Sequence, residues 1–199
     1  MDVNLSTNLT PGNTPISPEE QAELIPNLAT QEELNQWESE NILEARIWAL
    51  GERQIKQSDP FSEPYIRDLH RRMFFRTWKW AGSYRRSEKN IGVLVQEIRN
   101  RLPALLGNAR FWVQNNTYEI DEIAVRVHHE EVWIHPFPNG NGRHARLLAD
   151  VIAVKFGRPE FSWGQKNLVA AGPVRDAYLK ALKAADNGEI QELLSFSRS

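Results

Sequence analysis

The sequence predicts an all-α domain, and three observations support this fold class. Apolar residues recur at near-helical spacing along most of the chain, capping residues or prolines stand where these patterns start, and glycine or proline stands where they stop. No internal repeat interrupts the patterns. The 199 residues are 41% hydrophobic and 25% charged, which is typical of one soluble globular domain with an appended arm.

The arm is predicted over residues 1–18, which are rich in Asn, Thr, Pro and Ser and hold too few large apolar groups to pack. We therefore expect a flexible N-terminal arm at 1–18 and a single domain over 19–199, with its core at about 60–190.

The first long helix is predicted at 31–52. Thr30 followed by Glu33 forms the pattern of a capping box, in which each residue caps the backbone N–H of the other. An apolar stripe of near-helical spacing follows and is expected to face the core: Leu34, Trp37, Ile42, Ala45 and Trp48.

The remaining elements follow from the same signals. Pro64 starts a predicted helix to about residue 76, whereas glycines and a basic run make 78–95 an irregular segment or short β-hairpin. Further helices are predicted at 96–114, at 119–134, from Gly142 to about 157, at 173–186, and in a short stretch after Gly188.

Composition excludes several function classes. The chain has no Cys, so disulfides, thiol catalysis and Cys-ligated zinc are excluded. Its first residues, MDVNLSTNLTPGN, lack the basic and apolar regions of a secretory signal, and no apolar run approaches the ~18 residues of a membrane span. We therefore expect a cytoplasmic protein without membrane contact.

The net charge of −2 conceals an acidic stretch at 1–63 and a basic stretch at 66–110. The sequence pI of about 6.2 argues against a dedicated nucleic-acid binder, so no nucleic-acid partner is expected. A solvated or anion-facing surface, with Arg85, Arg86 and Lys89 in it, is the favoured interpretation.

The chemistry is concentrated in residues 135–146, HPFPNGNGRHAR, between two predicted helices. Gly140 and Gly142 allow positive φ and a close approach of backbone N–H groups to an anion at a helix N-terminus. Arg143 and Arg146 lie three apart on the first turn of that helix and can face the same anion, while His135 is a candidate base near neutral pH. A Gly-rich connector with surface arginines is the alternative; the combination favours transfer of a phosphorus-containing group.

These twelve residues match His-Pro-Phe-x-(Asp/Glu)-Gly-Asn-Gly-Arg-x-x-Arg at every fixed position except Asn139. The chain thereby resembles the Fic (Fic/DOC) domain family over about residues 30–190, and it is also similar to the small bacterial proteins labelled mobile mystery protein B. The resemblance implies a Fic-type helical bundle in which 78–95 is the flap that positions a target.

The resemblance also implies an activity, protein adenylylation. His135 would deprotonate a Ser, Thr or Tyr hydroxyl of a target protein, which attacks the α-phosphate of ATP and retains AMP. Phe137 would be the buried anchor of the loop. Phosphate contacts fall by position on Gly140, Asn141 and Gly142, with Arg143 at the β-phosphate and Arg146 at the γ-phosphate.

Asn139 departs from the family pattern, which has Asp or Glu there to help hold the Mg²⁺ bound to ATP. An amide oxygen is an uncharged and weaker ligand for a hard cation. Asn139 is therefore the metal-ligand candidate, Mg²⁺ with ATP is the expected cofactor, and the group transferred stays open.

Two other functions stay open beside adenylylation. A catalytically quiet Fic-fold partner of a toxin-antitoxin-like pair would bind nucleotide or protein without turnover. A Fic enzyme of another type would transfer or remove a different phosphate-linked group. ATP, an unidentified protein target and a cognate regulatory protein are the expected partners.

Three further groups of residues are candidates for a role. In many Fic proteins an inhibitory-helix glutamate pairs with the second motif arginine, so Glu44 is the inhibitory candidate, expected to contact Arg146, with an ordinary helix acid as the alternative. Trp78 and Trp80 are candidates for target contact as well as for core packing. The adjacent His128 and His129 have poor metal-ligand spacing, and one of them is expected in the interior.

Overall fold

The structure is a computed structural model that describes residues 14–28, 30–165, 168 and 172–199. Within these ranges it contains helices and no β-strand, which confirms the all-α class. The helices are α1 (Pro18–Gln21), α2 (Gln31–Leu50), α3 (Glu52–Gln57), α4 (Glu63–Phe74), α5 (Val95–Gln114), α6 (Ile120–Ile134), α7 (Asn141–Lys155), the 3₁₀ turn η1 (Trp163–Gln165), α8 (Pro173–Asp186) and α9 (Ile190–Ser197).

Most predicted elements are confirmed within a few residues. The helix expected at 31–52 ends at Leu50, because Gly51 has extended backbone (φ −62°, ψ 139°) and starts the separate helix α3. The segment 78–95 is irregular: its one isolated antiparallel bridge joins Trp78 to Leu24, which lies outside the segment. The short-hairpin alternative for this segment is therefore wrong.

Helix starts follow the caps that the sequence indicates. The side chain of Thr30 accepts from the N–H of Glu33, whose carboxylate accepts from the N–H of Thr30, at 3.1 and 3.0 Å. The Ser62 hydroxyl caps α4, with Pro64 in its first turn, where a missing N–H costs no hydrogen bond.

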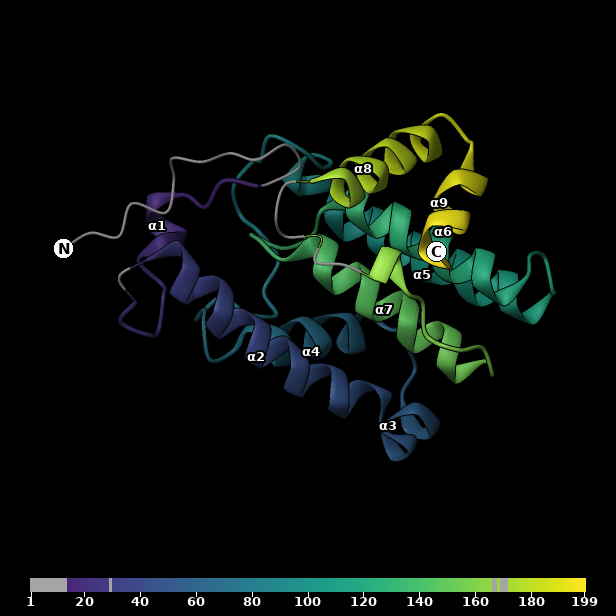
Figure 1. The fold of residues 1–199 in the computed structure, drawn as a ribbon, viewed down its shortest axis with the longest axis horizontal. Coiled ribbons are helices and arrows are strands. Elements are labelled where there is room, and N and C mark those ends of the chain that lie inside the picture. The colour runs from purple at the N-terminus through teal and green to yellow at the C-terminus, as the bar shows by residue number, and fades with distance from the viewer. Residues whose placement is uncertain (1–13, 29, 166–167, 169–171) are drawn as a thin grey trace.

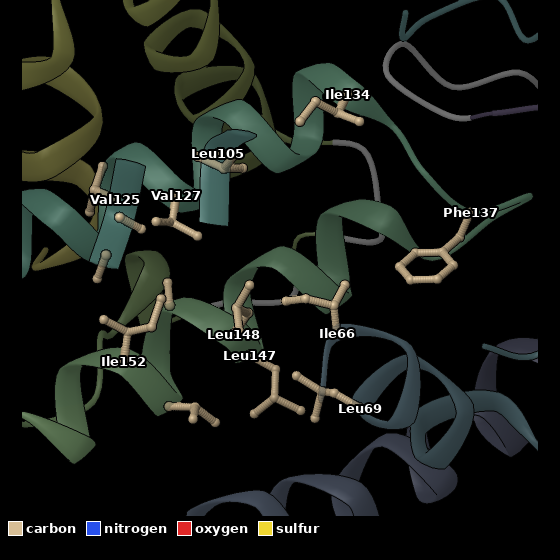
Figure 2. Close-up of a cluster of buried hydrophobic side chains, with 14 of the residues drawn as sticks. Ile66, Leu69, Leu105, Val125, Val127, Ile134, Phe137, Leu147, Leu148 and Ile152 are labelled. Carbon is tan, nitrogen blue, oxygen red and sulfur yellow. The ribbon is translucent and has the colours of Figure 1, made fainter. Parts of the chain in front are cut away.

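Helix α7 lies at the centre of the fold (Figure 1). It packs against α6 on one side and against α2 and α4 on the other, while α5 and α9 cover α6 and α8 packs on α9. Apolar side chains from α4, α6 and α7 meet in the core, including Ile66, Val127, Leu147, Leu148 and Ile152 (Figure 2). This core holds the end of α6 and the start of α7 in fixed relation, and the predicted site lies between them.

The buried face of α2 differs from the predicted apolar stripe. Its buried residues are Leu34, Glu38, Asn41, Ala45 and Ala49, whereas the expected core residue Trp37 is 37% exposed. Two polar side chains therefore lie on the inner face, where each has a partner: Glu38 bonds Trp78 and Asn41 donates to Thr77 at 3.1 Å. Buried polar groups are tolerated when they are hydrogen-bonded in this way. A hydropathy pattern does not reveal these partners, so it cannot predict that Glu38 and Asn41 are buried.

The predicted arm at 1–18 lies mostly on residues outside those described. Its described end, from Thr14 into α1, is docked on the domain. The chain after α1 continues along the flap: the N–H of Ile25 donates to the carbonyl of Thr77 at 2.8 Å, and that of Lys79 to the carbonyl of Glu23 at 3.1 Å.

In the described parts of the chain, none of the helices combines the length and the apolar character that crossing a bilayer requires.

We expect Leu148→Ala to lower the free energy of unfolding by about 2–5 kcal/mol, because the side chain is fully buried between helices and its removal leaves a cavity. Leu43→Ala is the matched control, since Leu43 is 58% exposed on α2 and should change stability by less than about 0.5 kcal/mol. Urea denaturation followed by circular dichroism measures both. Equal effects of the two substitutions would contradict the burial of Leu148 between these helices.

Candidate functional site

The predicted site is the loop between α6 and α7, and its backbone is turned sharply at both ends. His135 ends α6 in the left-handed region (φ 55°), and Gly140 precedes α7 with φ 79°. A Cβ atom at Gly140 would lie 2.5 Å from the ring of Phe74, so only glycine fits there. Gly142, in contrast, is inside α7 and is not among the positive-φ residues; the expectation of positive φ at Gly142 is wrong.

The loop is held from within by Phe137, His70 and Asn141. Phe137 is fully buried and stacks on the imidazole of His70 with ring centroids 3.7 Å apart. The Asn141 amide accepts from the N–H of Phe137 at 2.8 Å and donates to its carbonyl at 2.9 Å. His70 is also buried: Nδ1 accepts from the N–H of Gly82 at 2.9 Å, which leaves Nε2 to donate to the carbonyl of Asn139 at 3.1 Å.

His135 is 4% exposed, and its Nε2 faces the hydroxyl group of Thr14. Its Nδ1 lies 3.4 Å from the carbonyl of Val132 and its Nε2 lies 2.8 Å from the hydroxyl of Thr14. Burial lowers the pKa of His135 to about 4, assisted by the positive charges of Arg85 and Lys89. The imidazole is thus neutral near pH 7, with Nδ1–H directed to Val132 and Nε2 free to accept the Thr14 proton.

The flap supports this histidine from its other side. Arg85 is 2% exposed; its Nε donates to the carbonyl of His135 at 2.7 Å and its backbone N–H to the carbonyl of Pro136 at 2.9 Å. A Cβ atom at Gly92 would lie 2.6 Å from the Cβ of His135, so the flap backbone approaches the histidine closely. The interpretation of Arg85 as part of a solvated basic surface is therefore wrong: it is a buried clamp on the loop.

Lys89 is also removed from solvent, with a side chain 3% exposed. Its ammonium lies 2.5 Å from the carboxylate of Glu20 and donates to the carbonyl of Pro15 at 3.0 Å. Ser87 donates to the second oxygen of Glu20 at 3.0 Å. The flap thus binds the N-terminal segment through a buried ion pair.

The N-terminus of α7 provides an anion-binding surface. The N–H groups of Asn141, Gly142 and Arg143 have no acceptor within the helix, and the helix dipole adds partial positive charge there. The side chain of Asn141 is occupied by Phe137, so its backbone alone remains for a phosphate.

Arg143 is held by α2. Its guanidinium lies 2.5 Å from the carboxylate of Glu38, whose other oxygen accepts from the indole of Trp78 at 2.7 Å. The same guanidinium donates to the amide oxygen of Asn139 at 3.2 Å. Arg143 therefore stands at the start of α7 with its charge partly compensated.

Arg146 lies over the ring of Tyr178, with 5.5 Å between its central guanidinium carbon and the ring centroid. Of the carboxylates in the described chain, none comes within 4 Å of it. Burial lowers the pKa of Arg175, and the nearby charge of Arg146 lowers it further. Two cations close enough to repel each other make this side of the loop suited to an anion.

The structure does not bring Glu44 to Arg146. Glu44 is exposed and pairs with Arg76 at 2.9 Å, so the expected contact is wrong. The reason is the orientation of α2: the face that carries Glu38 is turned to α7, and Glu44 lies off that face. Glu38, which contacts Arg143 rather than Arg146, is the α2 carboxylate that reaches the loop.

The candidates for target contact and for metal binding are placed elsewhere. Trp78 and Trp80 are 1% and 7% exposed and stack on each other in the core, so they do not present a surface to a target. His128 is buried against the hydroxyl of Tyr178 at 3.1 Å, while His129 pairs with Asp186 at 2.8 Å. The described residues contain no cluster of three or more His, Asp or Glu with metal-site geometry.

Sequence reasoning missed Thr14, Glu38 and His70. A signal existed for Glu38, because it lies four residues after Leu34 and seven before Ala45, on one helical face. His70 lies one turn after Ile66 and one turn before Phe74, on the apolar face of its helix, which is a signal for burial. For Thr14 the local sequence holds no signal, since its partner His135 is 121 residues away.

Known proteins match this chain in sequence and in structure. The model of the Fic/DOC family matches residues 60–153. Protein adenylyltransferase Fic of Drosophila grimshawi is 29% identical over 135 residues, 66% of this chain and 26% of that protein. Protein adenylyltransferase Fic of Nematostella vectensis is 28% identical over 146 residues, 71% of this chain and 33% of that protein. The chain thus spans a quarter to a third of these relatives.

A solved structure of the BepC protein from Bartonella tribocorum, a VirB-translocated effector with bound AMPPNP, matches with a TM-score of 0.68. The match covers 92% of this chain and 97% of that chain at 17% sequence identity, so it shows a shared fold.

The buried histidines predict a loss of stability in acid. Burial is the first cause that lowers the pKa of His70, His128 and His135, to about 4 for His135. Because the unfolded side chains take up protons near pH 6.5, stability is full above that pH and falls as the pH drops toward 4. Each histidine adds at most about 1.4 kcal/mol per pH unit to the slope.

Urea unfolding at pH 4.5 to 8 measures this slope. His128→Gln, which can keep a hydrogen bond to the Tyr178 hydroxyl, should reduce the slope by the share of one histidine. A slope that is the same in both proteins would show that His128 is not protonated on unfolding.

Proposed function

We propose that this chain, whose residues 60–153 match the Fic/DOC family model, is a protein adenylyltransferase that transfers AMP from ATP to a protein hydroxyl. One observation carries the proposal: Nε2 of His135 lies 2.8 Å from the oxygen of an alcohol, beside the N-terminus of α7, whose free N–H groups suit an anion. A general base must lie within such a distance of the proton it removes. The relatives named above bear the same activity in their names.

Each site residue has its own role in the proposed reaction. His135 takes the hydroxyl proton through Nε2, while Arg85 holds its backbone carbonyl and the Val132 carbonyl holds its ring. The N–H groups of Gly142 and Arg143 bind phosphate oxygens, which is electrostatic stabilisation by preorganised donors. Arg146, which has no carboxylate partner in the described chain, binds the distal phosphate.

Arg143 has to bind the β-phosphate while it remains paired with Glu38. A guanidinium has five N–H donors, and Glu38 and Asn139 take two of its nitrogens, so donors remain for the β-phosphate. Glu38 therefore positions Arg143 and lowers its net attraction for the nucleotide at the same time.

Mg²⁺ would enter the site with ATP, as part of the substrate, and would supply positive charge to the phosphates. In the loop, Asn139 offers one neutral oxygen, which already accepts from Arg143, while its amide nitrogen donates to the carbonyl of Thr14 at 3.2 Å. These groups do not form a dedicated metal site. A cation that keeps its phosphate oxygens and waters needs few protein ligands, which is usual for Mg²⁺.

A protein carrying the acceptor hydroxyl and a cognate regulatory protein are the proposed partners. The likeness to the proteins labelled mobile mystery protein B and the cytoplasmic location remain predictions.

The second candidate is a catalytically quiet nucleotide-binding partner, and the uncharged Asn139 is the observation that favours it. Titration calorimetry separates the two functions. Tight binding of ATP without any transfer, in the presence of either Mg²⁺ or Mn²⁺, would favour the quiet partner. Transfer of label from another nucleotide instead of ATP would favour a Fic enzyme of another type.

We expect the protein, incubated with cell lysate and ATP labelled at the α-phosphate, to leave label on protein, and His135→Ala to reduce this by at least about 100-fold, the usual contribution of a general base. His129→Ala is the matched control, because His129 pairs with Asp186 away from the loop. ATP labelled at the γ-phosphate should leave no label that depends on His135, since kinases of the lysate label proteins equally with both variants. Equal labelling by wild type and His135→Ala would remove His135 from the chemistry.

We expect Asn139→Asp to lower the Mg²⁺ concentration needed for half-maximal ATP binding by about fivefold, since one charge close to a cation is worth at least ~1 kcal/mol even with partial screening. Calorimetric titrations of ATP at several Mg²⁺ concentrations measure this. Asn187→Asp, an exposed change at the end of α8, serves as the charge control. If the Mg²⁺ dependence is the same in all three proteins, residue 139 is not a metal ligand.

A further inference from the structure

The N-terminal segment places an alcohol of this chain where the acceptor of the proposed reaction must lie. The hydroxyl of Thr14 is 2.8 Å from Nε2 of His135, and the carbonyl of Thr14 accepts from the amide of Asn139 at 3.2 Å. Asn139 immediately precedes Gly140, where the anion-binding start of α7 begins. Thr14 thus spans the base and the phosphate-binding loop.

Further contacts beyond the histidine hold the segment that carries Thr14. Pro15 restricts Thr14 to extended backbone, and its carbonyl accepts from Lys89. The Ser17 hydroxyl and the Glu20 carboxylate close a capping box on α1. Glu20 is fixed by Lys89 and Ser87, and its carbonyl accepts from the indole of Trp80 at 3.2 Å. Thr14 is therefore preorganised, which is what proximity requires of a reactant.

The direction of the hydrogen bond also fits a nucleophile. Nδ1 of His135 lies toward the carbonyl of Val132, which can only accept, so the ring proton is on Nδ1 and Nε2 is the acceptor. Thr14 then donates its hydroxyl proton to Nε2, and the lone pairs of its oxygen remain available for attack. If Nε2 carried the ring proton instead, the Thr14 oxygen would accept that hydrogen bond, and His135 could not take the hydroxyl proton.

From these contacts we propose that Thr14 is a modification site, the acceptor hydroxyl to which this chain transfers an adenylyl group in cis. The inference rests on the proposed function, since ATP is the donor. It goes beyond that function because it names an acceptor atom within the chain.

Oγ1 of Thr14 forms a bond to the α-phosphorus of ATP, and the bond from that phosphorus to the oxygen bridging to the β-phosphate breaks. Pyrophosphate leaves with the electron pair of the broken bond. The hydroxyl proton passes to Nε2 of His135, and the product is a phosphodiester between Thr14 and AMP.

The test uses the full chain with ATP and Mg²⁺. Intact-mass spectrometry should show the gain of one adenylyl group per chain, and electron-transfer fragmentation of the N-terminal peptide should place it on Thr14. Thr14→Ser should keep the modification and Thr14→Val should lose it. Thr117→Val, an exposed threonine between α5 and α6, is the matched control and should be modified like the wild type.

Three outcomes would overturn the proposal while leaving the proposed function intact: a His135-dependent label confined to other proteins, a label on another hydroxyl of this chain, or transfer to other proteins that rises in Thr14→Val while Thr14 itself is never modified. The last would make Thr14 a plug and not an acceptor. Absence of α-label from every protein, together with ATP binding, would overturn the proposed function itself.

The cis reaction is tested by mixing wild-type chain with a tagged His135→Ala chain, which carries Thr14 but lacks the base. Label on the wild-type chain alone supports the proposal. Label on Thr14 of the tagged chain would show transfer between molecules and contradict the geometry.

The ion pair between Glu20 and Lys89 allows a second, independent test of the proposal. Glu20→Gln removes the charge that pairs with Lys89 and should slow modification of Thr14 by about tenfold, the scale of one charge-assisted hydrogen bond. Glu19→Gln is its neighbour and control, since Glu19 is exposed. Equal rates for the two variants would show that the docked segment is not the reacting conformation and would overturn the proposal.

Discussion

The stacking of Phe137 on His70 is the contact on which the site depends. It fixes the middle of the loop between α6 and α7 to α4, and the Asn141 amide then sets the backbone on either side. Because His70 also bonds the carbonyl of Asn139 and the N–H of Gly82, one buried imidazole joins the loop to the flap. The positions of His135, the proposed base, and of the N-terminus of α7 follow from this junction, which allows little independent movement of either.

The helices and the chemical loop could be predicted from the sequence because their causes are local. Caps such as Thr30 with Glu33 act within one turn, and the glycine at 140 is needed by the backbone turn itself. The inner face of α2 could not be predicted, since apolar periodicity favours Trp37 and overlooks Glu38. Burial of Glu38 depends on Trp78 and Arg143, which are distant in sequence. Glu44 is expected at the loop because of the resemblance to the family's inhibitory helix; in the structure Glu44 pairs with Arg76, and Glu38 contacts the loop through Arg143.

The basic flap shows a second limit of sequence reasoning. Charge composition places Arg85 and Lys89 on a solvated surface, because isolated charges are costly to bury. Both side chains are buried, and each is compensated: Arg85 by three backbone carbonyls, Lys89 by Glu20 and one carbonyl. Such compensation is a property of the assembled fold. The two charged side chains that the sequence pattern assigns to solvent are thus buried beside His135 and the N-terminal segment.

The docked N-terminal segment has a consequence for any acceptor protein in solution. Thr14 is tethered to the site that it occupies, and a tethered group competes at an effective concentration on the order of millimolar. An external hydroxyl at micromolar concentration would lose this competition by mass action unless its protein gained affinity from contacts away from the site. Selectivity would then reside in those remote contacts, and a short peptide copied from a target would be a poor substrate even if its sequence were right.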